Sequence, residues 1–203
     1  MNAEFWNRLR EYRSDNVFNP WGDSDPLDLP FASPIERAER LASHFDVDAK
    51  YLLIGEAPGY RGCHFSGIPF TCEKQLIKGE VPRVKATKRL TNREIPFSEG
   101  SATVIWGTLH ALGIADRTVM WNAYPFHPHK PGHLMSNRTP SPSEVRDGQL
   151  LLAMVLERFA GAQVIAIGLV ALRALHGFGC ASVRHPSMGG ANKFRAQMRE
   201  LAA

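Results

Sequence analysis

Short runs of consecutive apolar residues alternate along the chain with longer stretches in which apolar residues recur every three or four positions. Runs of the first kind are typical of strands buried on both faces, and the second spacing is typical of helices that pack one face on a core. Buried strands are therefore expected over 50–54, 118–122, 163–168 and 181–184. Helices are expected over 2–13, 34–44, 101–112, 141–159 and 171–175, and at the C-terminal end of the chain.

Helix starts and proline-rich stretches set the limits of these elements. Ser33, followed by Pro34 and by Glu36 three residues on, has the form of an N-cap with a capping box. The polar residues of 14–32 include three prolines, so we expect an extended surface segment there.

The order of these elements predicts the fold class. Strands that alternate with helices favour an α/β fold, and we expect a three-layer αβα sandwich around a central, mainly parallel four-stranded sheet. Residues 1–203 are expected to form a single domain, with the helices of 1–48 packed on it.

Charge changes this picture in one place. The net charge is +4, yet seven Lys and Arg side chains stand against the single acid Glu80 between residues 74 and 93. This local excess is larger than that of the whole chain, so the positive field is concentrated there. The stretch is either a solvated face or a contact for a phosphate backbone, for which Lys85, Lys88 and Arg89 are the candidates.

Cysteine usage and hydropathy restrict where the protein works. The three cysteines include no Cys-x-x-Cys pair, which argues against a disulfide framework or a zinc site and favours a reducing compartment. No apolar run approaches the roughly 18–20 residues of a membrane span, and the first residues lack the pattern of a signal peptide. We therefore expect a cytoplasmic protein with no membrane partner.

Three segments whose residues could bind a ligand or take part in catalysis stand at the ends of three of the expected strands. Gly55-Glu56-Ala57-Pro58-Gly59 follows the first, Asn122 ends the second, and His185-Pro186-Ser187 follows the last. Each of them alone is most often an ordinary turn or cap. In a parallel sheet, however, all three would leave from the same edge, which is where ligands bind in open α/β folds.

Together these segments, with Gly67-Ile68-Pro69-Phe70, resemble the motif set of the uracil-DNA glycosylase superfamily over about residues 50–195. The residues Gly55 to Gly59 resemble those of family 4, and the spacing from Ala57 to Phe70 is similar to that of the single-strand-selective monofunctional (SMUG) branch. The chain thus resembles a member intermediate between these two branches. The resemblance implies a monofunctional DNA glycosylase that flips uracil out of DNA and hydrolyses its N-glycosidic bond, which starts base-excision repair. It also implies uracil-containing DNA as the partner, a monomer, and a place in the bacterial cytosol or nucleoid.

The resemblance further implies roles for individual residues. Phe70 would stack on the flipped base, and the amide of Asn122 would match the N3–H and O4 of uracil. His185 would donate to uracil O2 as charge builds there, helped by backbone N–H groups near Glu56 and Ala57. Gly55 and Tyr60 would complete the base pocket, and Pro58, Gly59, Ser187 and the apolar wedge Met188 would contact DNA.

The chain departs from the family's pattern at three points. Ala57 stands where other branches carry the Asp or Asn that positions the attacking water, so that role is open to Glu56, His64 or a backbone carbonyl. Gly59 stands where one branch has a Tyr that excludes thymine, and Tyr60 could replace it. Family 4 binds an iron–sulfur cluster with four cysteines; this chain has three, so we expect no cofactor.

Other interpretations stay open at this level. Ala57 would suit a non-catalytic or very slow binder of uracil or abasic DNA. Gly59 would suit a glycosylase with a wider pocket for another deaminated base such as hypoxanthine. A nucleotide-phosphate enzyme is disfavoured because neither a P-loop nor a complete G-x-G-x-x-G is present. His127, His129 and His133 could read as a metal cluster, but their irregular spacing favours a loop against the DNA backbone, accompanied by Lys130 and Arg138.

Overall fold

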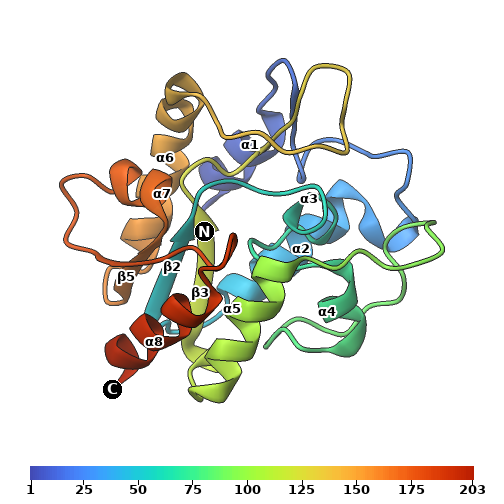
Figure 1. The fold of residues 1–203 in the computed structure, drawn as a ribbon. Coiled ribbons are helices and arrows are strands. Elements are labelled where there is room, and N and C mark those ends of the chain that lie inside the picture. Colours follow the sequence, from blue (N-terminus) through green and yellow to red (C-terminus); the bar gives the residue numbers. More distant parts are fainter.

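The computed structural model, which describes residues 1–203, is built around a four-stranded parallel sheet with strand order β3-β2-β5-β6 (Figure 1). The central strand β2 (Tyr51–Gly55) pairs with β3 (Thr118–Asn122) on one side and β5 (Gln163–Ile167) on the other. β6 (Ala181–Val183) pairs with β5 and forms the far edge. Because all four strands are parallel, their carboxyl ends lie along one edge of the sheet, as the sequence predicted.

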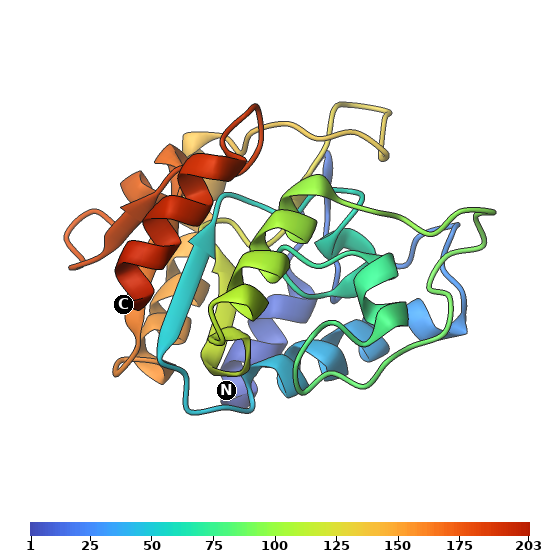
Figure 2. The same cartoon turned by 60° about the horizontal axis from the view of Figure 1, so that its bottom comes forward.

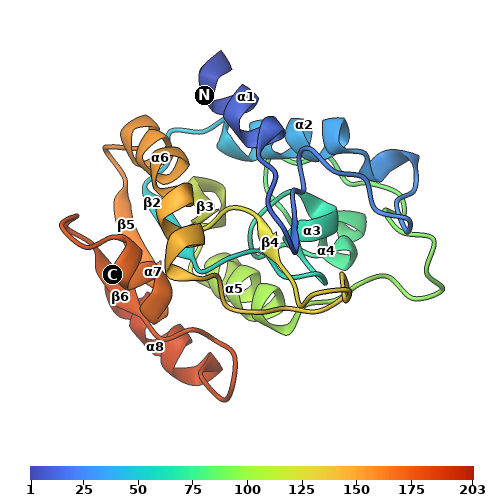
Figure 3. The ribbon, with the colours of Figure 1, turned by 90° about the horizontal axis from the view of Figure 1, so that it is seen from above.

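Helices cover both faces of this sheet. They are α1 (Ala3–Glu11), α2 (Pro34–Phe45), α3 (Cys63–Ser66), α4 (Glu73–Lys78), α5 (Gly100–Ala111), α6 (Pro142–Arg158), α7 (Leu169–Ala174) and α8 (Ala191–Ala202), with short 3₁₀ turns η1 (Pro30–Ala32) and η2 (Ala115–Arg117). Seen from above, the sheet lies between α1 and α6 on one side and α5 and α8 on the other (Figure 3). None of the helices is long and apolar enough to cross a membrane.

The two helical layers bury separate sets of apolar side chains. Leu52 and Ile54 of β2 belong to one cluster with Phe5 of α1, and Leu53 belongs to the other with Ile105 of α5. Successive side chains of a strand point to opposite faces, so one apolar run supplies both cores. Figure 2 shows α5 and α8 crossing in front of the strands on the second face. The predicted αβα sandwich is thereby confirmed.

Side-chain caps begin two of the long helices, and the one predicted at Ser33 forms only in part. At α6, Glu144 N–H donates to Ser141 Oγ (3.2 Å) and Ser141 N–H donates to Glu144 Oε2 (2.7 Å), which makes a complete capping box. At α2, Glu36 N–H donates to Ser33 Oγ (3.2 Å) without the return bond. The short helices α3 and α4 were not predicted, because four to six residues show no helical period.

The prediction that residues 14–32 form an extended surface segment is wrong. β1 (Val17–Phe18) pairs antiparallel with β4 (His127–Pro128), and Trp21 is buried against Trp121 with ring centroids 5.7 Å apart. The indole N–H of Trp21 donates to the carbonyl of Gly67 (3.2 Å). The segment is therefore part of the core layer, even though its composition is polar.

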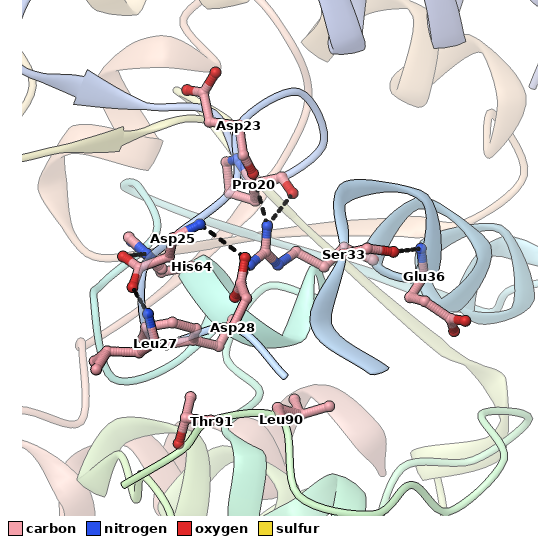
Figure 4. Close-up of polar contacts among 12 residues, drawn as sticks. Pro20, Asp23, Asp25, Leu27, Asp28, Ser33, Glu36, His64, Leu90 and Thr91 are labelled. Carbon is pink, nitrogen blue, oxygen red and sulfur yellow. Dashed lines mark hydrogen bonds and ion pairs between the residues drawn. The ribbon is translucent and has the colours of Figure 1, made fainter. Parts of the chain in front are cut away.

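Side-chain hydrogen bonds explain how so polar a segment can be buried. Asp25 accepts from Leu27 N–H (2.7 Å) and contacts His64 Nε2 (2.9 Å) (Figure 4). Arg37 of α2 is fully buried and pairs with Asp28. Buried polar groups are tolerated when each finds a partner, so this network replaces the apolar pattern that hydropathy would need to detect.

The outer edge of β3 is covered by side chains. Met120 N–H donates to His44 Nε2 of α2 (2.9 Å), and Arg83 donates to the carbonyl of Thr118 (3.1 Å). These bonds satisfy backbone groups that an edge strand otherwise leaves unpaired.

Candidate active site

A cavity of about 500 Å³ opens at the carboxyl edge of the sheet. The loops that leave β2 and β3 border it, and they run across the upper part of Figure 1. Nine residues that the sequence assigned to the site line it: Glu56, Ala57, Pro58, Gly59, Phe70, Asn122, His185, Ser187 and Met188. The convergence expected from a parallel sheet therefore brings the three loops to one place.

Gly55 sets the positions of two of these side chains. It ends β2 and pairs in register with Asn122 at the end of β3. A Cβ atom on Gly55 would lie 2.3 Å from Phe70 Cζ and 2.6 Å from Asn122 Oδ1. The aromatic ring and the amide thus occupy the space that a side chain at position 55 would take. Asn122 is 2 % exposed, and its amide makes no hydrogen bond within the protein and opens onto the cavity.

Phe70 is held in a conformation that few residues adopt. Its φ is +51°, in the left-handed region, which costs a residue other than Gly about 1–2 kcal/mol. Its ring is buried and faces that of His185, with centroids 6.2 Å apart and planes inclined by 43°. Strain of this kind persists where the surroundings fix the residue, and it concentrates at functional sites.

The hydrogen bonds of His185 define its tautomer. Ser187 N–H donates to His185 Nδ1 (3.1 Å), and Ser187 Oγ lies 2.7 Å from the same nitrogen. Because a backbone N–H can only donate, Nδ1 must be unprotonated. Burial, and then the nearby charge of Arg184, lower the pKa of His185 from its ordinary value. The ring is therefore neutral at neutral pH and offers Nε2–H as its donor.

The turn after Ser187 exposes a large apolar side chain. Met188 is 93 % exposed and has a φ of +51°. Gly190 closes the turn tightly, since a Cβ there would lie 2.0 Å from the carbonyl oxygen of His185. The chain thus presents Met188 at the rim of the cavity with little contact to the rest of the protein.

Tyr60 does not line the cavity. Its N–H donates to Asn137 Oδ1 (3.0 Å), while its ring packs edge-on against Phe97 and its hydroxyl accepts from Arg61 Nε (2.8 Å). The structure therefore does not bring Tyr60 to the base pocket where the sequence placed it.

The basic candidates Lys85, Lys88 and Arg89 also lie outside the cavity. Arg89 donates to the buried carboxylate of Glu73 (3.0 Å) and so has a structural partner. Lys85 and Lys88 line a separate hollow of about 420 Å³ beside α2, where Lys88 Nζ stands 5.7 Å from the ring of Phe31.

His64 is closed off from the cavity. It is fully buried, its Nε2 contacts Asp25 (2.9 Å) and its Nδ1 contacts His127 Nδ1 (2.8 Å). Both ring nitrogens are occupied, so the suggestion that His64 positions a water is wrong. His127 itself is buried in this pair, and no group of three or more His, Cys, Asp or Glu side chains is arranged to hold a metal ion.

Several lining residues were not assigned to the pocket from the sequence. They are Cys63, Glu99, Ser101, Asn137, Arg138 and Thr139. Asn137 fixes the glycine loop through its bond to Tyr60 N–H. Arg138 forms a bidentate salt bridge with Glu144 (2.6 and 2.7 Å). Their loop and the start of α5 reach the cavity only through tertiary packing, and the sequence contains no pattern that would have shown it.

Comparison with known proteins places this site in a family. The crystal structure of wild-type SMUG2 from Pedobacter heparinus is similar, with a TM-score of 0.63 over 97 % of this chain and 96 % of that one. At 14 % identity the similarity establishes the fold alone, and no curated protein sequence matches the chain. The family model of the uracil DNA glycosylase superfamily matches residues 42–202, a range that includes all three converging loops. The chain therefore belongs to the uracil DNA glycosylase superfamily.

Proposed function

We propose that the protein is a monofunctional DNA glycosylase that flips uracil out of DNA and hydrolyses its N-glycosidic bond. Superfamily membership supports a hydrolase of base-excision repair, and the choice of uracil is the further step. The observation that carries it is the unpaired amide of Asn122 beside the ring of Phe70 in one cavity.

Base recognition follows from the chemistry of that pair. The Asn122 amide has one acceptor oxygen and one donor nitrogen, which complement the N3–H and O4 of uracil. With the amide in the orientation seen here, whose Oδ1 lies toward Gly55, cytosine presents the reverse order and would leave the buried amide unpaired at a cost of about 1–3 kcal/mol. Stacking on Phe70 adds about 1–3 kcal/mol for any base, so it favours the flipped state without selecting among bases.

His185 supplies the stabilisation that the leaving base requires. When the bond between C1′ and N1 breaks, its electron pair stays on uracil and negative charge builds on O2. A neutral imidazole with Nε2–H donates to that oxygen, and the partly buried setting strengthens the bond. Backbone N–H groups of Glu56 and Ala57, which line the same cavity, are proposed for the same oxygen.

The rim of the cavity is the proposed contact with DNA. Met188 on its exposed turn suits an apolar wedge that fills the space left by the flipped nucleotide. Pro58 and Gly59 of the glycine loop, with Ser187, are proposed to lie against the backbone. In the free protein the hydroxyl of Ser187 is engaged with His185, so it also orients the ring.

The test is release of uracil from a labelled oligonucleotide that carries one uracil opposite guanine, opposite adenine or in a single strand. Asn122→Ala should lower the single-turnover rate more than about tenfold, because discrimination and orientation depend on the amide, while DNA binding changes little. Asn92→Ala, at an exposed asparagine, is the matched control. No release by the wild type from any substrate would overturn the proposal, and equal rates in Asn122→Ala would remove its recognition role.

A glycosylase for another deaminated base is the second candidate. Gly59 has no side chain and Tyr60 packs away from the cavity against Phe97, so neither residue narrows the pocket. The same assay with hypoxanthine in place of uracil decides between them, since the true substrate is released faster. Binding of uracil-DNA without release of any base would instead identify a non-catalytic binder.

A further inference from the structure

The proposed hydrolysis leaves one task without a residue: the attacking water must be held and must lose a proton. Ala57 has no polar side chain, and His64 is buried away from the cavity. Two carboxylates line the cavity, those of Glu56 and Glu99. Glu56 belongs to the glycine loop that follows β2, and Glu99 directly precedes α5.

The backbone makes room for the carboxylate of Glu99. Glu99 directly precedes α5, but its side chain forms no capping bond to that helix. It lies instead over Gly62, where a Cβ atom would come within 1.9 Å of Glu99 Oε2 and 3.1 Å of its Cδ. The glycine between the motif loop and α3 therefore allows the carboxylate to enter the site.

This carboxylate has no partner within the protein. The buried acids Glu73 and Glu144 both have partners, since Glu73 accepts from Leu90 N–H (2.8 Å) and Glu144 pairs with Arg138. Glu99 is half-buried. Glu99 makes neither a hydrogen bond nor an ion pair, and burial raises its pKa to about 7. A carboxylate left unpaired at such a cost is a candidate for function when it faces a cavity.

No charged group close by compensates Glu99. The charge of Glu99 acts on two thiols, those of Cys63 in α3 and Cys72 before α4; burial raises the pKa of both, so they are neutral. Glu56, Arg138 and His185 line the same cavity, and Arg138 is already paired with Glu144. Ionisation of Glu99 is therefore governed mainly by its partial burial at the wall of the cavity.

We infer that Glu99, through its position over Gly62 at the wall of the cavity, holds the attacking water and accepts its proton. This inference rests on the proposed function. The water oxygen bonds to C1′ as the C1′–N1 bond breaks and its electron pair leaves with uracil. One water proton passes to the Glu99 carboxylate and later returns through solvent to the uracil anion, so that the products are uracil and an abasic deoxyribose.

The expected signature is a pH profile. Only ionised Glu99 can accept the proton, so the single-turnover rate should rise with pH through about 7 and level off above it. Glu99→Gln should lower the plateau by at least about tenfold and remove this rise. Glu99→Asp, which keeps the carboxylate, should be slower than wild type but retain the rise. Glu94→Gln, an exposed acid on the same segment, is the control that should leave rate and profile unchanged.

The outcomes separate this inference from the proposed function. Uracil release by the wild type together with an unchanged rate and pH rise in Glu99→Gln would overturn the role of Glu99 and leave the proposed function standing. A slower Glu99→Gln that keeps the rise would show a structural role only, and would overturn the inference as well. No release of uracil by the wild type at any pH would overturn the proposed function, and the role of Glu99 with it.

Discussion

A residue without a side chain organises the centre of the cavity. Gly55 leaves open the space that Phe70 and Asn122 share, and a methyl group there would overlap both. Gly55→Ala must displace the ring or the amide, and a misplacement of about 1 Å can cost about a hundredfold in rate. We therefore expect Gly55→Ala to lower single-turnover release of uracil by about a hundredfold, with a loss of about 1–3 kcal/mol in the free energy of unfolding.

The control for this change is Gly107→Ala. Position 107 lies inside α5 with open space around it, so an added methyl group meets nothing. Because alanine is the better helix former, this variant should unfold at the same or a higher temperature. Its single-turnover rate of uracil release should equal that of the wild type. Release of uracil by Gly55→Ala at the wild-type rate would contradict the contact between Gly55, Phe70 and Asn122.

At the scale of elements, the edge of β3 depends on a neutral histidine. Met120 N–H donates to His44 Nε2, so that nitrogen must be unprotonated. Burial, and then the charge of Arg83, lower the pKa of His44 to about 3. Protonation would turn the acceptor into a donor facing another donor, and would place an unpaired charge between α2 and the sheet.

The sign of the resulting pH dependence is fixed. His44 is protonated near pH 6.5 in the unfolded chain but only near 3 in the folded one, so its contribution to stability is complete above about 6.5. As the pH falls from there toward 3, we expect the free energy of unfolding to drop by about 1.4 kcal/mol per pH unit from this residue. Urea unfolding at several pH values between about 7 and 4.5 measures the slope.

His44→Gln isolates this contribution, because the amide oxygen can still accept from Met120 N–H and does not titrate. The variant should show a shallower loss of stability on acidification. His176→Gln, at an exposed histidine after α7, should keep the wild-type slope. An unchanged slope in His44→Gln would assign the acid sensitivity to other groups, such as the buried pair of His64 and His127.

At the scale of the molecule, the sequence was sufficient to predict helices and strands wherever the spacing of apolar residues determined them. The apolar runs ending at Gly55 and Asn122 are strands because they are buried on both faces, and their parallel register brings the motif loops together. The same reasoning failed for residues 14–32, where Asp25 is buried through hydrogen bonds rather than through an apolar pattern. It also missed Glu99, whose place in the cavity depends on packing over Gly62.

Some of the basic side chains of residues 74–93 are bonded within the protein. Arg89 is bound to Glu73, and Arg83 donates to backbone carbonyls at the edge of β3. A charge used inside the protein is less available to a phosphate backbone. Of the candidates named from the sequence, Lys85 and Lys88 keep exposed ammonium groups beside α2.

If these two lysines meet DNA outside the cavity, their contribution appears in the salt dependence of binding rather than in the chemical step. Each phosphate contact contributes about 0.9 to the slope of log affinity against log salt, so Lys85→Glu with Lys88→Glu should flatten that slope by about two. The rate of uracil release from saturated complexes should not change, since neither residue lines the cavity. Lys50→Glu is the matched control, because this exposed lysine lies just before β2, at the end of the sheet away from the cavity. Titrations of labelled DNA at increasing salt measure the slope, and an equal slope in the double variant would make this stretch a solvated face.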